Sequence, residues 1–367
     1  MNKLYTISGC LLLAFAALLG ILTLCLPSKE YSENENRYLQ TRPALSAKEL
    51  LSGSAQEDIQ AFMNDQIPGR DMFNSLAVRV QKLLGKRDIS DVYIGADGYY
   101  LEKVTRTDID IARFEKNIRR INDFAGEHAD IPVTLMLVPT AGIVLGEELP
   151  AHAEMYDADT LSSRANELAD NALVLDIREA LCGDKDEQLY YRTDHHWTSR
   201  GARLGARAYL EQMGREYRDR ELILFSDEFR GTLYSKVLDP DSEYDRVELA
   251  ALPCDFNVKL DGENSELYHR EASSEKDKYK VFFGGNYSHV DISGGGGAGT
   301  LMIVKDSFAN CFVPFVADSY ERVIMVDPRY YSGSLAELAD SQEVSEVLFL
   351  YELSNFCGDS YLLRTMI

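Results

Sequence analysis

The sequence predicts an α/β fold in which helices cover both faces of a mostly parallel sheet, with a transmembrane anchor at the N-terminus. Short apolar segments recur along the chain, as expected of strands buried on both faces of a sheet. Amphipathic helical segments lie between them, and such alternation is typical of parallel sheets. One apolar segment near the N-terminus is also long enough to cross a bilayer.

Residues 1–27 are predicted to be an N-terminal transmembrane anchor or a signal sequence. No charged side chain occurs from Leu4 to Pro27, and a membrane-spanning helix needs about 20 residues. Lys3 precedes this segment, which favours a cytoplasmic Met1 and an extracellular C-terminal domain. A cleaved signal peptide is the alternative, although no A-x-A-like site follows the apolar run. Either way, the globular part is expected to be exported.

The composition fits a folded, acidic domain. Apolar residues make up 45% of the 367 residues, and 60 acidic side chains against 38 basic ones leave a formal charge of -22. Such a surface repels phosphate backbones, so we expect no nucleic-acid partner. A neutral or cation-bearing polymer fits this charge better than a polyanion.

Four of the six cysteines lie outside the apolar segment: Cys182, Cys254, Cys311 and Cys357. They show no C-x-x-C spacing, which argues against a zinc knuckle. Disulfides and buried free thiols are both compatible with this spacing.

Residues 28–85 are predicted to be a stalk followed by an N-terminal helical segment. Residues 28–54 are polar and lack clear periodicity. A short amphipathic helix then carries Ile59, Phe62, Met63 and Ile67 and ends at Pro68-Gly69. Residues 86–367 are predicted to be the catalytic domain, and Asp91–Leu101 begins it as a hairpin with Asp97-Gly98 as the turn.

Helical and strand segments follow in alternation. Apolar residues at helical spacing predict a helix over 111–124, and Ser199 is a plausible N-cap for a helix over 199–213. Buried strands are predicted at 132–139, 173–175, 300–305, 322–326 and 347–351. Residues 215 to about 295 break the alternation, and we interpret them as an insertion whose flexible tip is Gly294–Gly297.

Two segments carry residues that could perform chemistry. Ser307 follows the strand at 300–305 and precedes a helix. A serine on such a turn can present its Oγ to solvent, and its N–H at a helix N-terminus would face a developing oxyanion. Asp194 and His196 are two residues apart, so an extended segment would place both on one side, with His195 pointing away. A serine needs such a base, and the base needs a carboxylate to fix its tautomer.

Trp197 follows this pair and could either pack beneath the site or stack on a sugar. Metal binding by Asp194, His195 and His196, as in the DHH phosphoesterases, is an alternative interpretation. The other four histidines occur in no context that would complete such a site, so we expect no metal and no cofactor.

The Asp194-His195-His196-Trp197 run resembles the name-giving motif of the DHHW family. The likeness continues through further segments in the same order: Ser32–Arg37, Asp65 with Pro68–Asp71, Ile94–Tyr100, Lys305–Asn310 and Asp327–Tyr331. The DHHW family in turn is similar to the SGNH-like domains of the alginate O-acetylation proteins, where an Asp-x-His pair precedes the nucleophilic serine. The resemblance therefore implies an SGNH-hydrolase-like (flavodoxin-like) domain with permuted motif order.

The resemblance also implies roles for individual residues. Asp194 would orient the base His196, and Ser307 would be the nucleophile, with Lys305 standing where glycine usually does. Tyr351 or Asn355 would supply a second oxyanion donor. Arg329 could hold a polar or acidic substrate group or form an ordinary salt bridge, and His195 and Trp197 are further candidate substrate contacts.

The function predicted from these features is an exported O-acetyltransferase or acetylesterase that acts on a cell-surface or extracellular polysaccharide. Since an exported domain cannot reach cytosolic acetyl-CoA, a membrane-bound O-acyltransferase is expected to deliver the acetyl groups. The alternative is a non-catalytic carbohydrate-binding or scaffolding protein of the cell envelope, because fold does not guarantee function.

Overall fold

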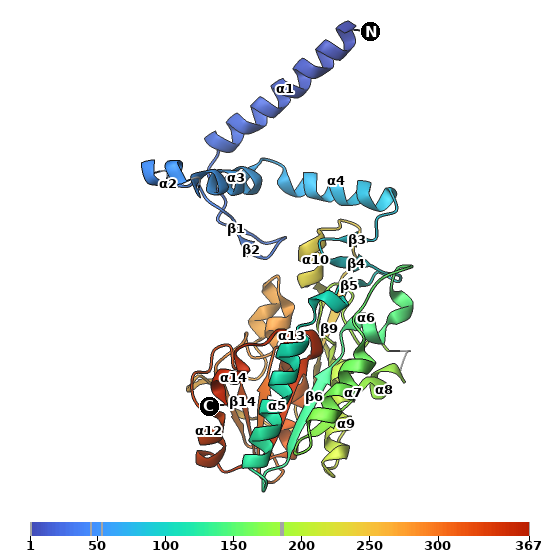
Figure 1. Ribbon diagram of the computed structural model, residues 1–367, viewed down its shortest axis with the longest axis vertical. Coiled ribbons are helices and arrows are strands. Elements are labelled where there is room, and N and C mark those ends of the chain that lie inside the picture. Colours follow the sequence, from blue (N-terminus) through green and yellow to red (C-terminus); the bar gives the residue numbers. More distant parts are fainter. Residues whose placement is uncertain (1, 45, 53, 184–186, 367) are drawn as a thin grey trace. The chain divides into compact units, whose positions relative to one another are not determined.

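The computed structural model describes residues 2–44, 46–52, 54–183 and 187–366 (Figure 1). The chain divides into two compact units. Unit 1 is Met1–Arg87 with Tyr234–Asp241, and unit 2 is Asp88–Leu233 with Ser242–Ile367.

Unit 1 begins with the predicted apolar helix, α1 (Asn2–Cys25). Its segment Lys3–Cys25 has a mean hydropathy of 2.4 over its most apolar window, and only 6% of that window is buried. By length and composition this helix could cross a membrane, and a signal sequence would pass the same test.

The segment predicted as a stalk contains regular structure. After α1, the elements of unit 1 are β1 (Tyr31–Ser32), β2 (Arg37–Tyr38), α2 (Ala47–Ser52), α3 (Ser54–Gln66) and α4 (Arg70–Leu83). The predicted amphipathic helix is α3, which ends before Pro68. Gly69 then turns the chain into α4 with a φ of 78°, a conformation that favours glycine.

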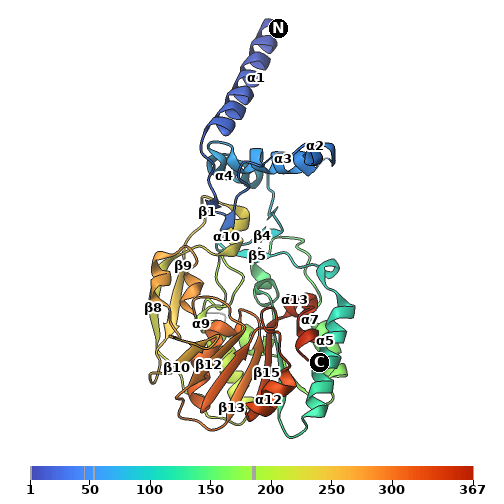
Figure 2. The same cartoon turned by 90° about the vertical axis from the view of Figure 1, so that its left-hand side faces the viewer.

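Unit 2 is built on a sheet whose strands run in the order β11-β10-β12-β14-β13-β15-β6-β7. The strands from β14 to β7 are parallel, whereas β12, β10 and β11 pair antiparallel at one side. Figure 2 shows part of this sheet face-on. Its strands are β6 (Val133–Val138), β7 (Leu173–Leu175), β10 (Asn257–Leu260), β11 (Glu263–Ser265), β12 (His289–Ser293), β13 (Thr300–Lys305), β14 (Arg322–Val326) and β15 (Val344–Glu352).

Helices pack on both faces of the sheet, as predicted for this fold class. One core joins α5, α7, α12 and α13 to side chains such as Met302 and Val304, and the other joins α9 and α11 to Leu301 and Ile303. The alternation of these four neighbours between the two cores is the two-residue period of a strand. The helices of unit 2 are α5 (Ile111–Glu127), α6 (Ala141–Val144), α7 (Ala158–Leu168), α8 (Arg178–Cys182), α9 (Ser199–Gln212), α11 (Ala309–Phe312), α12 (Leu335–Ser341), α13 (Leu353–Gly358) and α14 (Leu362–Thr365), and α10 is Thr232–Val237.

Two smaller sheets complete the described elements. The predicted hairpin is present as β4 (Val92–Ile94) and β5 (Tyr100–Glu102), with β3 (Asp88–Ile89) beside β4. Asp97 and Gly98 have φ values of 45° and 78° and are the central residues of the turn, which the Tyr99 N–H closes on the Ala96 carbonyl. The second small sheet pairs β8 (Leu222–Phe229) with β9 (Asp245–Ala250).

The structure corrects two details and adds one. The N-cap of α9 is Thr198, whose side chain accepts from the Arg200 and Gly201 amides, and not Ser199. Within residues 215–295, which the sequence analysis interprets as an insertion, β10, β11 and β12 extend the main sheet. The glycine run is not a flexible tip, since a Cβ on Gly295 or Gly297 would lie 2.0 Å from a backbone carbonyl oxygen.

All six cysteines are free thiols. Cys311 and Cys357 are buried, as the free-thiol interpretation expects, while Cys182 and Cys254 are exposed.

Candidate active site

Ser307 lies directly after β13, at the carboxyl end of a central parallel strand. The strand order reverses here, because β14 pairs on one side of β13 and β15 on the other. Such switch points are where open α/β sheets collect their ligands. From Leu301 to Asn310, Ser307 alone is half-buried, and its neighbours are buried. The predicted helix N-terminus is weaker than expected, because α11 comprises only Ala309–Phe312.

Asp306 fixes the turn that presents this serine. Its carboxylate accepts hydrogen bonds from the backbone N–H of Phe308, from that of Glu352 and from Asn355 Nδ2, each at 2.9 Å. These contacts tie the end of β13 to β15 and α13. Burial raises the pKa of Asp306, while these hydrogen bonds oppose the shift.

Lys305 is a buried lysine, 1% exposed, at the position where the SGNH pattern has glycine. Its Nζ donates to Asn310 Oδ1 at 2.8 Å and to Asn286 Oδ1 at 3.0 Å. Burial lowers the pKa of this ammonium to about 8, although Asp327 opposes the shift. The side chain is therefore accommodated by partners of its own, which explains how lysine can replace glycine here.

Backbone hydrogen bonds and one buried carboxylate fix the Asp194–His196 loop. The His196 carbonyl accepts from the Tyr191 amide at 3.2 Å, so the loop closes on itself before α9. Asp245 of β9 accepts from the amides of Arg192 and Thr193, each at 2.8 Å. A carboxylate from a distant segment thus anchors the loop through its backbone.

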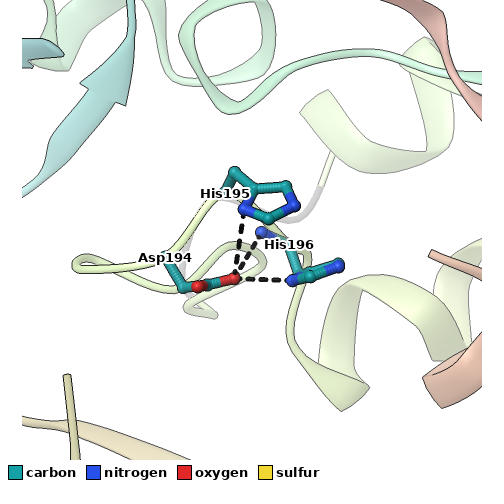
Figure 3. Close-up of side chains that lie close together, drawn as sticks. All are labelled: Asp194, His195 and His196. Carbon is teal, nitrogen blue, oxygen red and sulfur yellow. Dashed lines mark hydrogen bonds and ion pairs between the residues drawn. The ribbon is translucent and has the colours of Figure 1, made fainter. Parts of the chain in front are cut away.

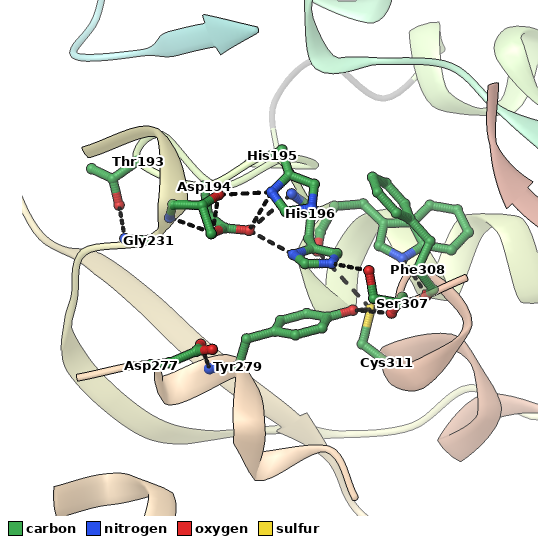
Figure 4. Close-up of polar contacts among 12 residues, drawn as sticks. Thr193, Asp194, His195, His196, Gly231, Asp277, Tyr279, Ser307, Phe308 and Cys311 are labelled. Atoms are coloured by element: carbon green, nitrogen blue, oxygen red, sulfur yellow. Dashed lines mark hydrogen bonds and ion pairs between the residues drawn. The ribbon is translucent and has the colours of Figure 1, made fainter. Parts of the chain in front are cut away.

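The structure joins Asp194, His196 and Ser307 in one hydrogen-bonded chain (Figure 4). Asp194 Oδ1 lies 2.6 Å from His196 Nδ1, and His196 Nε2 lies 2.8 Å from Ser307 Oγ. With Nδ1–H donating to the carboxylate, Nε2 accepts from the serine hydroxyl. This is the arrangement in which an imidazole can remove the serine proton.

The electrostatics of the pair suit a neutral base. Burial, together with the charge of His195, lowers the pKa of His196 to about 4 against the opposing effect of Asp194. Burial acts to raise the pKa of Asp194, but the two histidines and the hydrogen bonds from His196 and Thr232 hold it well below its usual range. Near pH 7 the imidazole is therefore neutral and the carboxylate ionised.

Sequence reasoning missed the residues that hold the second oxygen of Asp194. Thr232 donates to Oδ2 through its backbone N–H at 2.7 Å and its hydroxyl at 2.9 Å. A Cβ on the preceding Gly231 would lie 2.2 Å from the same oxygen, so only glycine lets this strand-to-helix segment approach so closely. No local motif marks these positions, and Thr232 lies 38 residues from Asp194.

Tyr279 is a second residue that the sequence analysis did not find. Its ring stacks on the His196 imidazole at a centroid distance of 3.9 Å and an interplanar angle of 11°. Its hydroxyl donates to the Ser307 carbonyl at 2.9 Å (Figure 4). Tyr279 thus contacts both the base and the serine backbone, but as one of 21 tyrosines it carried no signal of its own.

His195 does not point away from Asp194, as the alternation argument predicted. Its Nδ1 lies 3.6 Å from Asp194 Oδ1 (Figure 3). The same atom lies 2.7 Å from Thr232 Oγ1. The argument failed because the segment bends and is not an extended strand. His195 is half-buried beside the His196 ring, which leaves it available as a substrate contact.

The three side chains of the alternative metal site lie close together. One possible ligand atom from each of Asp194, His195 and His196 lies within 4.8 Å of the others. These atoms already have protein partners, however. A metal would have to displace the hydrogen bonds from Thr232 to Asp194 and from Ser307 to His196.

Trp197 is a core residue and offers no face to a sugar. It is 0% exposed, and its Nε1 donates to the Phe308 carbonyl at 2.9 Å. Gly205 of α9 makes room for the indole, because a Cβ there would lie 3.0 Å from the ring. The packing alternative is therefore correct. Trp197 stabilises the serine turn through its hydrogen bond to Phe308, the residue after Ser307.

Tyr351, Asn355 and Arg329 line a cavity of about 300 Å³ together with Lys305 and Asp306. Asn355 donates its amide to Asp306, and Arg329 makes a two-pronged ion pair with Asp327 at 2.8 and 2.6 Å. The structure thus brings these three beside the serine turn, with Arg329 in the ordinary salt bridge. The buried Tyr351 hydroxyl has no hydrogen-bond partner among the described residues.

Two family models match this chain. The model of the SGNH hydrolase-like domain of the acetyltransferase AlgX matches residues 92–229, and the model of the DHHW protein matches residues 161–326. The resemblance to the DHHW family is confirmed. The DHHW match includes the Asp194–His196 loop and Ser307, whereas the AlgX match includes only the loop. No curated protein matches the chain.

Solved structures show the same fold. A DHHW family protein from Eubacterium siraeum superposes with a TM-score of 0.61 at 22% identity, covering 74% of this chain and 92% of that one. PatB1 from Bacillus cereus, determined with a sulfonyl adduct, gives a TM-score of 0.62 at 19% identity, covering 74% and 97%. The predicted SGNH-like α/β fold is thereby confirmed.

Proposed function

We propose that this chain is a membrane-anchored, exported O-acetyltransferase that modifies a polysaccharide through Ser307, His196 and Asp194. The observation that supports this most directly is the unbroken chain of short contacts from Asp194 through His196 to Ser307. The match to a model named for an acetyltransferase supports the acyl chemistry.

In the first step, Ser307 Oγ attacks the acetyl carbonyl of the donor while its proton passes to His196 Nε2. The bond between the acetyl carbon and the donor oxygen breaks, and His196 returns the proton to that leaving oxygen. In the second step, a sugar hydroxyl gives its proton to His196 and its oxygen attacks the acetyl carbon. The bond between that carbon and Ser307 Oγ breaks, and His196 returns the proton to Ser307 Oγ. Asp194 stays ionised throughout and stabilises the imidazolium that forms in each step.

The proposed location and partners follow from α1 and from the chemistry. With α1 as an uncleaved anchor, unit 2 is extracellular and needs an acetyl donor that reaches it across the membrane. A membrane-bound O-acyltransferase would supply it. The formal charge of -22 favours a neutral or cation-bearing polysaccharide as acceptor over a polyanion.

The same site would be an acetylesterase if water took the place of the sugar hydroxyl. Ser307 is half-buried and not sealed from solvent, which keeps this second candidate open to test. Comparing the release of free acetate with transfer to oligosaccharides separates the two, because transfer requires that the acceptor outcompetes water.

The first test is mass spectrometry of the full chain after incubation with p-nitrophenyl acetate. The wild type is expected to gain an acetyl adduct or release p-nitrophenol, while Ser307→Ala and His196→Ala lose ~10³-fold or more in rate. Ser341→Ala, at an exposed serine of α12, is the matched control and should behave as wild type. Equal behaviour of all four proteins would instead support a non-catalytic carbohydrate-binding protein.

A further inference from the structure

One face of α4 carries a row of exposed apolar side chains. Met72, Leu76 and Val80 are 64%, 57% and 45% exposed, and Leu83 and Leu84 at the end of the helix are 86% and 81% exposed. Their spacing of three to four residues places them on one side of the helix. A continuous apolar row of this kind marks an interaction surface, unlike scattered single residues.

The contacts that α4 makes within unit 1 are mainly polar. Arg79 pairs with Asp241 at 2.8 Å and Lys82 with Asp239 at 2.6 Å, while Val78 is the buried apolar residue of this helix. A surface helix usually buries its apolar stripe and exposes its charges. In α4 an apolar row is exposed instead, and this row is the part of the helix that an apolar environment would cover.

The start of α4 is tied to the chain that leaves α1. Gln66, four residues before α4, accepts from the Lys29 amide at 2.9 Å and donates to the Lys29 carbonyl at 2.8 Å. Arg70, the first residue of α4, donates to Glu35 at 2.9 Å. Since α1 ends at Cys25, these contacts attach the start of α4 to the segment that directly follows the apolar helix.

Basic side chains stand at the far end of the apolar row. Lys86 and Arg87 are exposed and follow Leu83 and Leu84 after Gly85. Because the whole chain carries a formal charge of -22, an anionic surface would repel most of the molecule and attract this end. An apolar row bordered by basic residues is the pattern of a helix that lies in a membrane interface.

We propose that the exposed face of α4 docks on an anionic lipid bilayer, with Met72, Leu76, Val80, Leu83 and Leu84 among the upper acyl chains and Lys86 and Arg87 at the headgroups. This inference goes beyond the proposed chemistry and rests on its anchor, because the helix that inserts is what brings α4 to the same membrane. Docking gives unit 1 a second attachment beside α1.

The test uses the full chain in vesicles of phosphatidylcholine and phosphatidylglycerol whose acyl chains carry bromine, which quenches tryptophan on contact. Leu76→Trp places a reporter on the face, and the native Trp197 is buried in unit 2 and serves as a constant background. Emission from Trp at position 76 should shift to the blue and fall about twofold relative to unbrominated vesicles. Arg119→Trp, at an exposed position of α5, is the control and should stay unquenched.

A second pair of measurements separates lipid from other occupants. Adding Lys86→Glu and Arg87→Glu to the Leu76→Trp chain should weaken quenching in phosphatidylglycerol vesicles and leave it unchanged in pure phosphatidylcholine. A chain that floats with the vesicles but shows no quenching at position 76 overturns the α4 proposal and leaves the anchor intact. A blue shift that instead depends on protein concentration would assign the face to a second copy, and a chain that does not float overturns both.

Discussion

The two halves of the candidate site are held in place by different means. Ser307 belongs to the sheet, because its turn is fixed by Asp306, which receives hydrogen bonds from β15 and α13. Asp194 and His196 belong to a loop that is positioned by side chains from remote segments, namely Asp245, Thr232 and Tyr279. The strand pattern gave the position of Ser307 at the end of β13, whereas the placement of His196 depends on contacts between distant parts of the chain.

The largest expected loss of activity follows from replacing Asp194, the carboxylate of the loop. Asp194→Asn keeps the shape of the side chain but no longer fixes the Nδ1–H tautomer of His196, so acetyl-adduct formation should fall ~10⁴-fold. Thermal unfolding of the variant should show that it is folded. A loss of less than tenfold would mean that Asp194 serves only to shape the loop.

A smaller effect should follow from a change that does not touch the triad chemically. Gly231→Ala puts a Cβ where Asp194 Oδ2 now lies, so the carboxylate must shift and adduct formation should drop roughly 10²-fold. Gly358→Ala is the matched change in the serine half, since a Cβ at Gly358 meets nothing within 4 Å. If both variants react at the wild-type rate, a shifted Asp194 carboxylate does not impair the reaction, and the proposed difference between the loop and the serine turn is wrong.

The smallest effect is a displacement of the pH profile. Because the pKa of His196 lies at about 4, the base should stay neutral and adduct formation should stay constant down to about pH 5, then decline as pH falls through 4. An ordinary histidine would lose activity near pH 6.5. Since His195 contributes to lowering this pKa, His195→Asn should move the acidic limb upward, and an unchanged limb would show that His195 exerts no such influence.

The strands and long helices of unit 2 were predictable because their apolar patterns are local. Val133–Val138 is buried at every position, and α5 buries one face at helical spacing. The role of residues 257–293 was not predictable, because β10 and β12 join the sheet through pairings with strands far along the chain. The strands β1 and β2 in the polar stretch 28–54 were likewise not predictable, because they are stabilised by pairs such as Arg37 with Asp65, which are distant in sequence.

The candidate site divides in the same way. The pairing of Asp194 with His196 followed from their separation of two residues, and the position of Ser307 followed from the strand before it. The orientation of His195 did not follow, because a bend cannot be told from an extended segment by spacing. Tyr279 and Gly231 could not be found, since each matters only through a partner that is remote in sequence.

His196 and Ser307 are 111 residues apart along the chain, and this separation determines at which stage of folding the site can form. Closing so long a loop makes late, slow contacts in folding. With the proposed export, N-terminal end first, the Asp194–His196 loop would emerge well before Ser307. The chain would then cross the membrane before Ser307 could react, and the proposed reactivity would begin only once β13 lies between β14 and β15.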